Sequence, residues 1–340
     1  MTNYGESIRN PNNKGFSKYI VKEDYAPYIK QNTFCVCKSI YDIFYLIYTS
    51  KNNSIIFYNL LYDKKINEIK NTHKQYITNY RHYLDNYNKR DLIISLCLDD
   101  NNLKLLNVNN YECLLNIENV NKNGGLLSAC FLNDNKQIYI VSSNENEGSV
   151  EKIKVFDLNG KVVKEIENSN CSVNYIDIYY DNKNSKIYIL TSNDDNVRSY
   201  DYNKNKIYQI YGKEEKKDYL FDHCHNYLTI NNKEELIESC ENGNISIYNF
   251  HSAALLKRIN VGGYSLSCFC LWNNELILAG SRNIIKLIEI KSEKIIKDLN
   301  GFNIKVVYIA KINHPKYGES LISHGWLNGR IKIWINKCNY

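Results

Sequence analysis

Three short clusters in this sequence hold cysteine and histidine side chains, the residue types that bind zinc. Cys35-Val36-Cys37 and Cys268-Phe269-Cys270 each place two thiols on one face of a strand, because residues i and i+2 of a strand point the same way. His223-Cys224-His225 does the same with two imidazoles. Zinc sites space their paired cysteines by two to four residues and need a second pair, whereas these cysteine pairs lie inside apolar runs. We therefore predict that the four cysteines are buried and unbridged without a metal, and that the histidines are structural.

A second cluster combines aromatic and basic side chains, which together can bind single-stranded RNA. Its tyrosines interleave with three basic residues, in the set Lys74, Tyr76, Tyr80, Arg81, His82, Tyr83 and Tyr87. Because the chain contains 30 Tyr, an ordinary strand and loop explains the run better than a base-stacking platform. RNA binding through this region stays open as an alternative, and loss of binding in Tyr80→Ala would be its signature.

The motifs that carry common enzyme chemistry are missing from the sequence. It has no nucleophile elbow, Walker loop, dinucleotide-binding glycine motif or HExxH pair. We therefore predict a protein that is not an enzyme and that needs no cofactor.

Charge and cysteine usage restrict the class of protein further. The net charge of +6 comes from 43 basic and 37 acidic residues spread along the chain, which is typical of a solvated surface and gives no reason to expect nucleic acid as a partner. The N-terminus lacks a signal-peptide core, no long apolar span is present, and the 11 Cys are an odd number. These features predict a cytoplasmic or nuclear protein with reduced thiols, not secreted and without a transmembrane segment.

The elements that would carry these side chains form a repeat. An apolar-x-apolar run ending in a large residue, the anchor, recurs seven times between Tyr58 and Trp334, and the six steps average 46 residues. The anchors are Tyr58, Leu106, Phe156, Tyr200, Tyr248, Ile288 and Trp334. This spacing suits a four-stranded propeller blade of roughly 40–45 residues with some longer loops.

The repeat resembles that of the WD-repeat β-propeller family, and the resemblance covers nearly the whole chain. The family pattern ends its third strand in Trp-Asp; Phe156-Asp157 and Tyr200-Asp201 keep the Asp, and Tyr58-Asn59 and Tyr248-Asn249 carry Asn instead. Trp334 keeps the Trp but is followed by Ile. In such a repeat a His near the first strand often hydrogen-bonds inward.

The resemblance and the period together predict an all-β fold, a seven-bladed β-propeller of four-stranded antiparallel blades. The last blade begins near Lys305 and has only three strands before the chain ends, so we expect Lys18–Lys22 to supply its outer strand and close the ring. The expected organisation is a flexible arm at 1–17, one propeller domain at 18–336 and a tail at 337–340.

The family resemblance also implies a docking face, where the loops between second and third strands meet the entries to the blades. Carried over by position, the partner-binding candidates are Lys51, Asp99, Asn193, Glu241, Arg282, Trp326 and Leu327, with Glu145 and Glu147 in an insertion of the third blade. Trp326 could instead pack between the last and first blades.

The function predicted from these observations is a non-enzymatic WD-repeat scaffold that binds protein or peptide partners on a propeller face, as part of a multi-protein complex. The alternatives are an RNA-binding propeller and a phosphoinositide-binding, membrane-associated propeller. For the latter, Lys257-Arg258 is the nearest basic pair, and the Phe-Arg-Arg-Gly motif of such relatives is absent.

Overall fold

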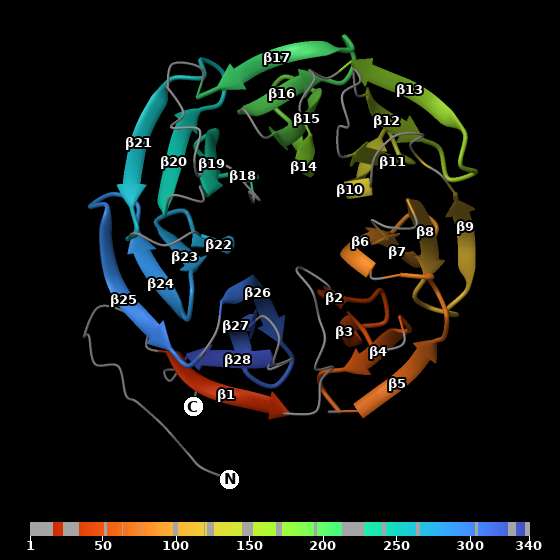
Figure 1. The fold of residues 1–340 in the computed structure, drawn as a ribbon, viewed down its shortest axis with the longest axis horizontal. Coiled ribbons are helices and arrows are strands. Elements are labelled where there is room, and N and C mark those ends of the chain that lie inside the picture. Colours follow the sequence, from red (N-terminus) through yellow and green to blue (C-terminus); the bar gives the residue numbers. More distant parts are fainter. Residues whose placement is uncertain are drawn as a thin grey trace.

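The seven anchors all lie on the third strand of a blade, and all are buried. In the computed structural model the strands form seven antiparallel sheets arranged as blades around a ring, a seven-bladed β-propeller (Figure 1). The period of the sequence therefore predicted the number of blades correctly. The structure describes residues 16–22, 34–50, 53–62, 64–75, 77–97, 101–118, 120, 126–144, 152–167, 172–193, 196–212, 228–239, 243–262, 266–302, 305–325 and 331–336.

Six blades are made of four consecutive strands each. Blade 1 comprises β2 (Phe34–Lys38), β3 (Phe44–Thr49), β4 (Ile55–Asn59) and β5 (Lys64–Ile69). Blade 2 comprises β6 (Ile77–Asp85), β7 (Arg90–Cys97), β8 (Asn102–Asn107) and β9 (Cys113–Ile117). Blade 3 comprises β10 (Leu126–Asp134), β11 (Gln137–Asn144), β12 (Lys152–Phe156) and β13 (Val162–Glu167). Blade 4 comprises β14 (Val173–Asp181), β15 (Lys186–Asn193), β16 (Val197–Asp201) and β17 (Lys206–Tyr211). Blade 5 comprises β18 (Leu228–Ile230), β19 (Glu235–Ser239), β20 (Asn244–Asn249) and β21 (Leu255–Asn260). Blade 6 comprises β22 (Cys268–Asn273), β23 (Leu276–Gly280), β24 (Ile284–Glu289) and β25 (Lys294–Asn300).

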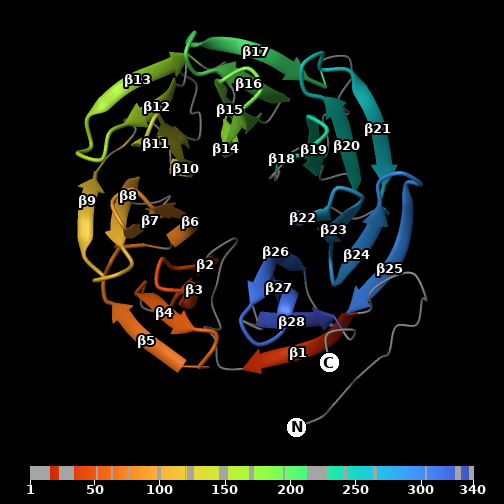
Figure 2. The same cartoon turned by 180° about the vertical axis from the view of Figure 1, so that it is seen from behind.

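Blade 7 has three consecutive strands, β26 (Val306–His314), β27 (Gly318–Gly325) and β28 (Ile331–Asn336). The N-terminal strand β1 (Phe16–Lys22) runs antiparallel to β28, with Tyr19 opposite Ile333. Figure 2 shows β1 along the rim, outside β28. The strand starts two residues before the predicted Lys18.

The hydrophobic core is divided among the seven boundaries between blades. Strand residues alternate between two faces, so each blade packs one face against each neighbour. At the boundary between blades 7 and 1, for example, Ile322 and Ile333 pack with Phe34 and Leu46, all buried. Apolar burial is the main favourable contribution to stability, and here it depends on the ring arrangement, because no blade covers its own faces.

Because the strands are antiparallel, the first-to-second turns of all blades and the third-to-fourth turns of blades 1 to 6 lie at one end of the ring, which we call the hairpin face. The opposite end carries the second-to-third loops and the connections between blades, and we call it the connection face. The residue after the anchor caps the third-to-fourth turn: Asn59 Oδ1 accepts from the Leu61 and Tyr62 N–H groups at 2.8 and 3.0 Å. Asp157 Oδ1 does the same for its own turn, at 2.9 Å from the Asn159 and Lys161 N–H groups. The turn needs only an acceptor oxygen, so Asn replaces Asp without loss of the cap.

The outer strands share a β-bulge beside the anchor. In blade 3, Val155 lies opposite Lys164 and Phe156 opposite Val162, so Val163 is the extra residue. The same shift occurs in the other five blades whose strands are consecutive, where the extra residues are Ile66, Leu114, Tyr208, Leu256 and Ile296. A bulge of this kind bends the strand and increases its twist.

Lysine side chains link neighbouring blades. Two residues before their anchors, the ammonium groups of Lys154 and Lys286 donate to the carbonyl oxygens of Val120 and Val261 in the preceding blade connection, both at 2.6 Å. Lys164, on an outer strand, donates to the Tyr202 carbonyl in the turn of the next blade, also at 2.6 Å. Charge-assisted bonds of this type are stronger than bonds between neutral groups.

Candidate functional site

Most of the predicted connection-face residues lie outside the described part of the chain: Lys51, Asp99, Glu145, Glu147, Glu241, Trp326 and Leu327. The two candidates within the described part, Asn193 and Arg282, differ in how far solvent or a partner can reach their side chains. Asn193, in β15, is only 1% exposed, so a partner cannot contact its side chain in this structure. Arg282 is exposed in the loop between β23 and β24, as a docking residue would be.

The cysteine pairs lie in the first strands of blades 1 and 6. Cys35, Cys37 and Cys268 are buried, Cys270 is half-buried, and all four are free thiols, so three of the four have the predicted burial. A hydrogen bond with Cys35 raises the pKa of Cys37 well above its usual value, and burial raises that of Cys270 to about 12. Thiols in this state are poor nucleophiles and poor metal ligands. Within the described residues no group of three His, Cys, Asp or Glu side chains could hold a metal ion, and His223 and His225 lie outside them.

The tyrosine run is divided between core and surface. Tyr80 is buried in β6, with its hydroxyl 2.8 Å from that of Thr49. The Tyr83 hydroxyl accepts from Asn133 Nδ2 at 2.8 Å, whereas Tyr87 is exposed in the following turn. Tyr76 is not among the described residues. The described tyrosines of the run therefore do not form one stacking platform.

The basic pair considered for phosphoinositides is partly committed to internal contacts. Lys257 donates to the Ile290 and Lys291 carbonyl oxygens at 3.0 and 3.1 Å and lies 3.3 Å from a Glu293 carboxylate oxygen. A lipid phosphate would have to compete with these groups.

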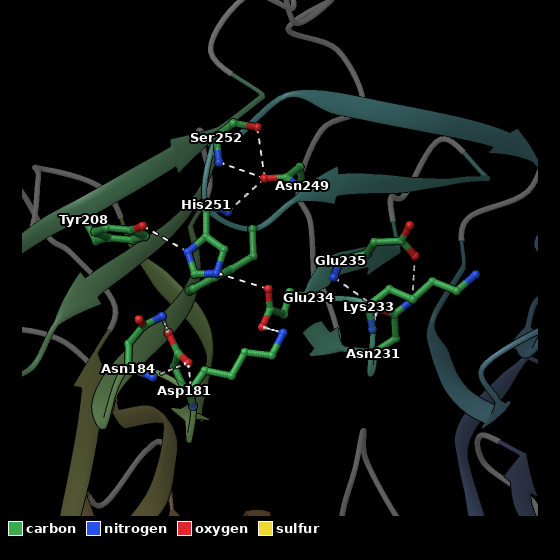
Figure 3. A network of polar contacts seen from close by, with 12 residues as sticks. Asp181, Asn184, Tyr208, Asn231, Lys233, Glu234, Glu235, Asn249, His251 and Ser252 are labelled. Atoms are coloured by element: carbon green, nitrogen blue, oxygen red, sulfur yellow. Dashed lines mark hydrogen bonds and ion pairs between the residues drawn. The ribbon is translucent and has the colours of Figure 1, made fainter.

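A polar network crosses the boundary between blades 4 and 5 on the hairpin face (Figure 3). The Tyr208 hydroxyl lies 3.0 Å from His251 Nδ1, and His251 Nε2 lies 3.4 Å from Glu234. Lys183 contacts Glu234 at 2.5 Å, and its hydrogen bond lowers the pKa of that carboxyl. Each member comes from a turn or from the bulge of β17, so the local backbone positions the whole series. A phenol, an imidazole and a carboxylate in sequence can transfer a proton, but here they connect two blades.

A second His–carboxylate pair lies within blade 2, and its carboxylate also contacts the backbone of blade 1. His82 Nε2 is 3.0 Å from Asp91 Oδ1, and Asp91 Oδ2 accepts from the Ile40 N–H at 3.0 Å. Such a pair can activate a nucleophile. The nearby thiol of Cys37, whose pKa Asp91 helps to raise, is held in the protonated form. The geometry therefore makes Asp91 a structural link, since it contacts His82 within blade 2 and the Ile40 backbone of blade 1.

Close to the ring axis, Arg81 of blade 2 reaches a residue of blade 4. Its guanidinium carbon lies 4.7 Å from the centre of the Tyr175 ring. Burial raises the pKa of the neighbouring Asp177, an effect that the charge of Arg81 opposes. These half-buried groups join first strands that are not adjacent in the ring.

The most exposed large hydrophobic side chains among the described residues are three tyrosines on the hairpin face of blades 1 and 2. Tyr41, Tyr62 and Tyr87 are 66%, 68% and 71% exposed. We call them the tyrosine surface. Lys64 lies over the Tyr62 ring at 5.8 Å and Lys136 over the Tyr87 ring at 5.3 Å. Sequence reasoning missed this surface, although the signal was present. Each tyrosine follows a turn-capping residue within two or three positions; the caps are Ser39, Asn59 and Asp85.

Comparison with protein-family models and with curated protein sequences found no match to this chain. The fold thus defines the class, a seven-bladed β-propeller. Across the residues that the structure describes, no helix is long and apolar enough to cross a membrane.

Proposed function

We propose that this propeller is a WD-repeat scaffold that acts by binding a protein partner rather than by catalysis. The WD-repeat assignment is supported by the buried anchors at equivalent positions and by His73. This His precedes the first strand of blade 2, is buried, and has its Nε2 2.9 Å from the Ser95 hydroxyl, which is the inward hydrogen bond that the resemblance implies.

The tyrosine surface is the observation that supports partner binding. Three tyrosines that are each about two thirds exposed lie in turns of two adjacent blades, at one end of the ring. Tyrosine is enriched in protein interfaces and in their energetic hot spots, because it contributes a large contact area and a hydroxyl at low entropic cost. The partner proposed is therefore a folded protein or a peptide in the cytoplasm or nucleus, and the connection face with Arg282 is a second docking region.

Affinity capture with quantitative mass spectrometry tests the proposal. The full chain is compared with a triple variant, Tyr41→Ser, Tyr62→Ser and Tyr87→Ser. The matched control carries Leu114→Ser, Val163→Ser and Leu256→Ser, which removes three exposed apolar residues from the rim. We expect one partner to be recovered by the full chain and by the rim variant and to fall at least about tenfold with the tyrosine variant. Equal recovery by all three proteins would refute the role of the tyrosine surface, and no reproducible partner would refute the scaffold function.

We also propose that β1 closes the ring. Its pairing with β28 gives blade 7 an outer strand from the opposite end of the chain, so that hydrogen bonds join the two ends. Neither the RNA-binding nor the phosphoinositide-binding alternative has comparable support, because Tyr80 is buried and Lys257 is bonded internally.

A further inference from the structure

Blade 7 differs from the other blades in how its outer strand is attached. In blades 1 to 6 the outer strand follows the third strand after a turn of four or five residues. The outer strand of blade 7 is β1, which is separated from β2 by the eleven residues 23–33 and has no direct connection to β28. Its docking to β28 therefore does not depend on a tight turn.

The register of the pair differs as well. β1 pairs without interruption from Phe16 opposite Asn336 to Ile20 opposite Lys332, and its shift comes only after that. The anchor Trp334 lies opposite Lys18 within this regular segment, whereas the other six anchors lie beside a bulge. The edge of β28 thus accepts five successive residues of a plain extended strand.

An edge of this kind can pair with any extended segment of suitable pattern. The segment that fits best is the same strand from a second molecule, because it reproduces every hydrogen bond of the pair in the same register. Eleven extended residues span at most about 40 Å, which is long enough to reach a neighbouring ring. Two copies that exchange β1 keep all their strand pairs.

We propose that the outer edge of β28 is a strand-docking site that accepts β1 from a second copy of this chain as well as β1 of its own. The proposal rests on closure of the ring by β1. The protein would then exist as a monomer and as a strand-exchanged dimer in slow equilibrium, and high concentration would favour the dimer.

A pair of cysteines tests it on the full chain. Ser17 and Ile335 lie opposite each other in the register, where residues have Cβ atoms about 4.5–5.5 Å apart. The S17C and I335C double variant is prepared in isotopically light and heavy forms, mixed, concentrated, diluted and oxidised, and cross-linked peptides are identified by mass spectrometry. The S17C single variant is the control, because any cross-link that it forms must involve a native cysteine.

If β1 is exchanged, disulfides between positions 17 and 335 should join light chains to heavy chains. The fraction of these mixed disulfides should rise with the protein concentration that is reached before dilution. If every cross-link lies within one chain, the exchange of β1 between copies is refuted, and closure of the ring by β1 still holds. If no 17–335 cross-link forms, within a chain or between chains, both the ring closure by β1 and its exchange are refuted. Native mass spectrometry of the unsubstituted light and heavy chains provides a check that needs no variant: a mixed dimer supports the exchange, and monomer alone at all concentrations contradicts it.

Discussion

Replacing Lys154 with methionine removes the bond between blades 2 and 3 but keeps the apolar stem of the side chain. The ammonium donates to the Val120 carbonyl oxygen at 2.6 Å, and the lysine is half-buried. Hydrogen bonds to charged groups contribute about 1.5–3 kcal/mol to stability. Because water reaches part of this site, we expect a loss near the lower end, about 1.5–2 kcal/mol.

The corresponding shift in melting temperature follows from the size of the protein. Unfolding entropy is about 2.1 cal/mol/K per residue, which for 340 residues gives roughly 0.7 kcal/mol/K. A loss of about 2 kcal/mol therefore lowers the Tm by about 3 °C. Intrinsic fluorescence during a thermal ramp resolves this difference, and the far-UV spectrum shows whether the fold is intact.

Lys104 provides the matched control, because it occupies the same position relative to its anchor in blade 2 and is also half-buried. In the described part of the chain its ammonium has no hydrogen-bond or ion-pair partner. Lys104→Met should change the Tm by less than about 1 °C. If the two variants melt at the same temperature, the lysine–carbonyl bonds do not stabilise the ring, and the reasoning is refuted.

Three further predictions concern the chain ends, a turn and acid stability. Deletion of residues 1–24 should destabilise the whole ring cooperatively while deletion of 1–15 changes little; equal Tm values for the full chain and the longer deletion would mean that the ring closes in another way. Asp157→Ala should cost about 1 kcal/mol in chemical denaturation because two backbone N–H groups lose their acceptor, whereas Asp157→Asn should be nearly neutral; a large cost for Asn would show that the charge matters. Lys183 lowers the pKa of Glu234, so this carboxylate stabilises the fold above its usual pKa of 4.5 and loses that effect as the pH falls through the lowered value. Glu234→Gln should therefore flatten the fall in Tm on acidification, and an unchanged slope would contradict this assignment.

The strand pattern was readable from the sequence because apolar residues alternate and each blade ends its third strand in an anchor. The anchors Phe156, Tyr200 and Trp334, for example, lie in the strands β12, β16 and β28 at the third position of their blades. Leu106 and Ile288 lack the aromatic ring of the other anchors but are completely buried, because the position requires apolar volume and not a particular ring.

The contacts between blades were not predictable in the same way. A lysine in a strand, such as Lys154 or Lys286, has the sequence pattern of a solvated surface residue, and its carbonyl partner is identifiable only when the neighbouring blade is in place. The tyrosine surface was hidden for a different reason. With 30 tyrosines in the chain, composition does not distinguish a buried Tyr80 from an exposed Tyr87.

The repeated bulge has a consequence for how these molecules behave when they meet. The six outer strands of blades 1 to 6 carry this bulge on the rim of the ring, and several expose apolar residues there, among them Val163 and Leu256. Long, flat, apolar strand edges promote edge-to-edge aggregation, which a bulge opposes by twisting the edge and interrupting its hydrogen-bonding groups. A chain rich in isoleucine and tyrosine strands can thus have an apolar rim around most of its circumference and still resist stacking into fibres.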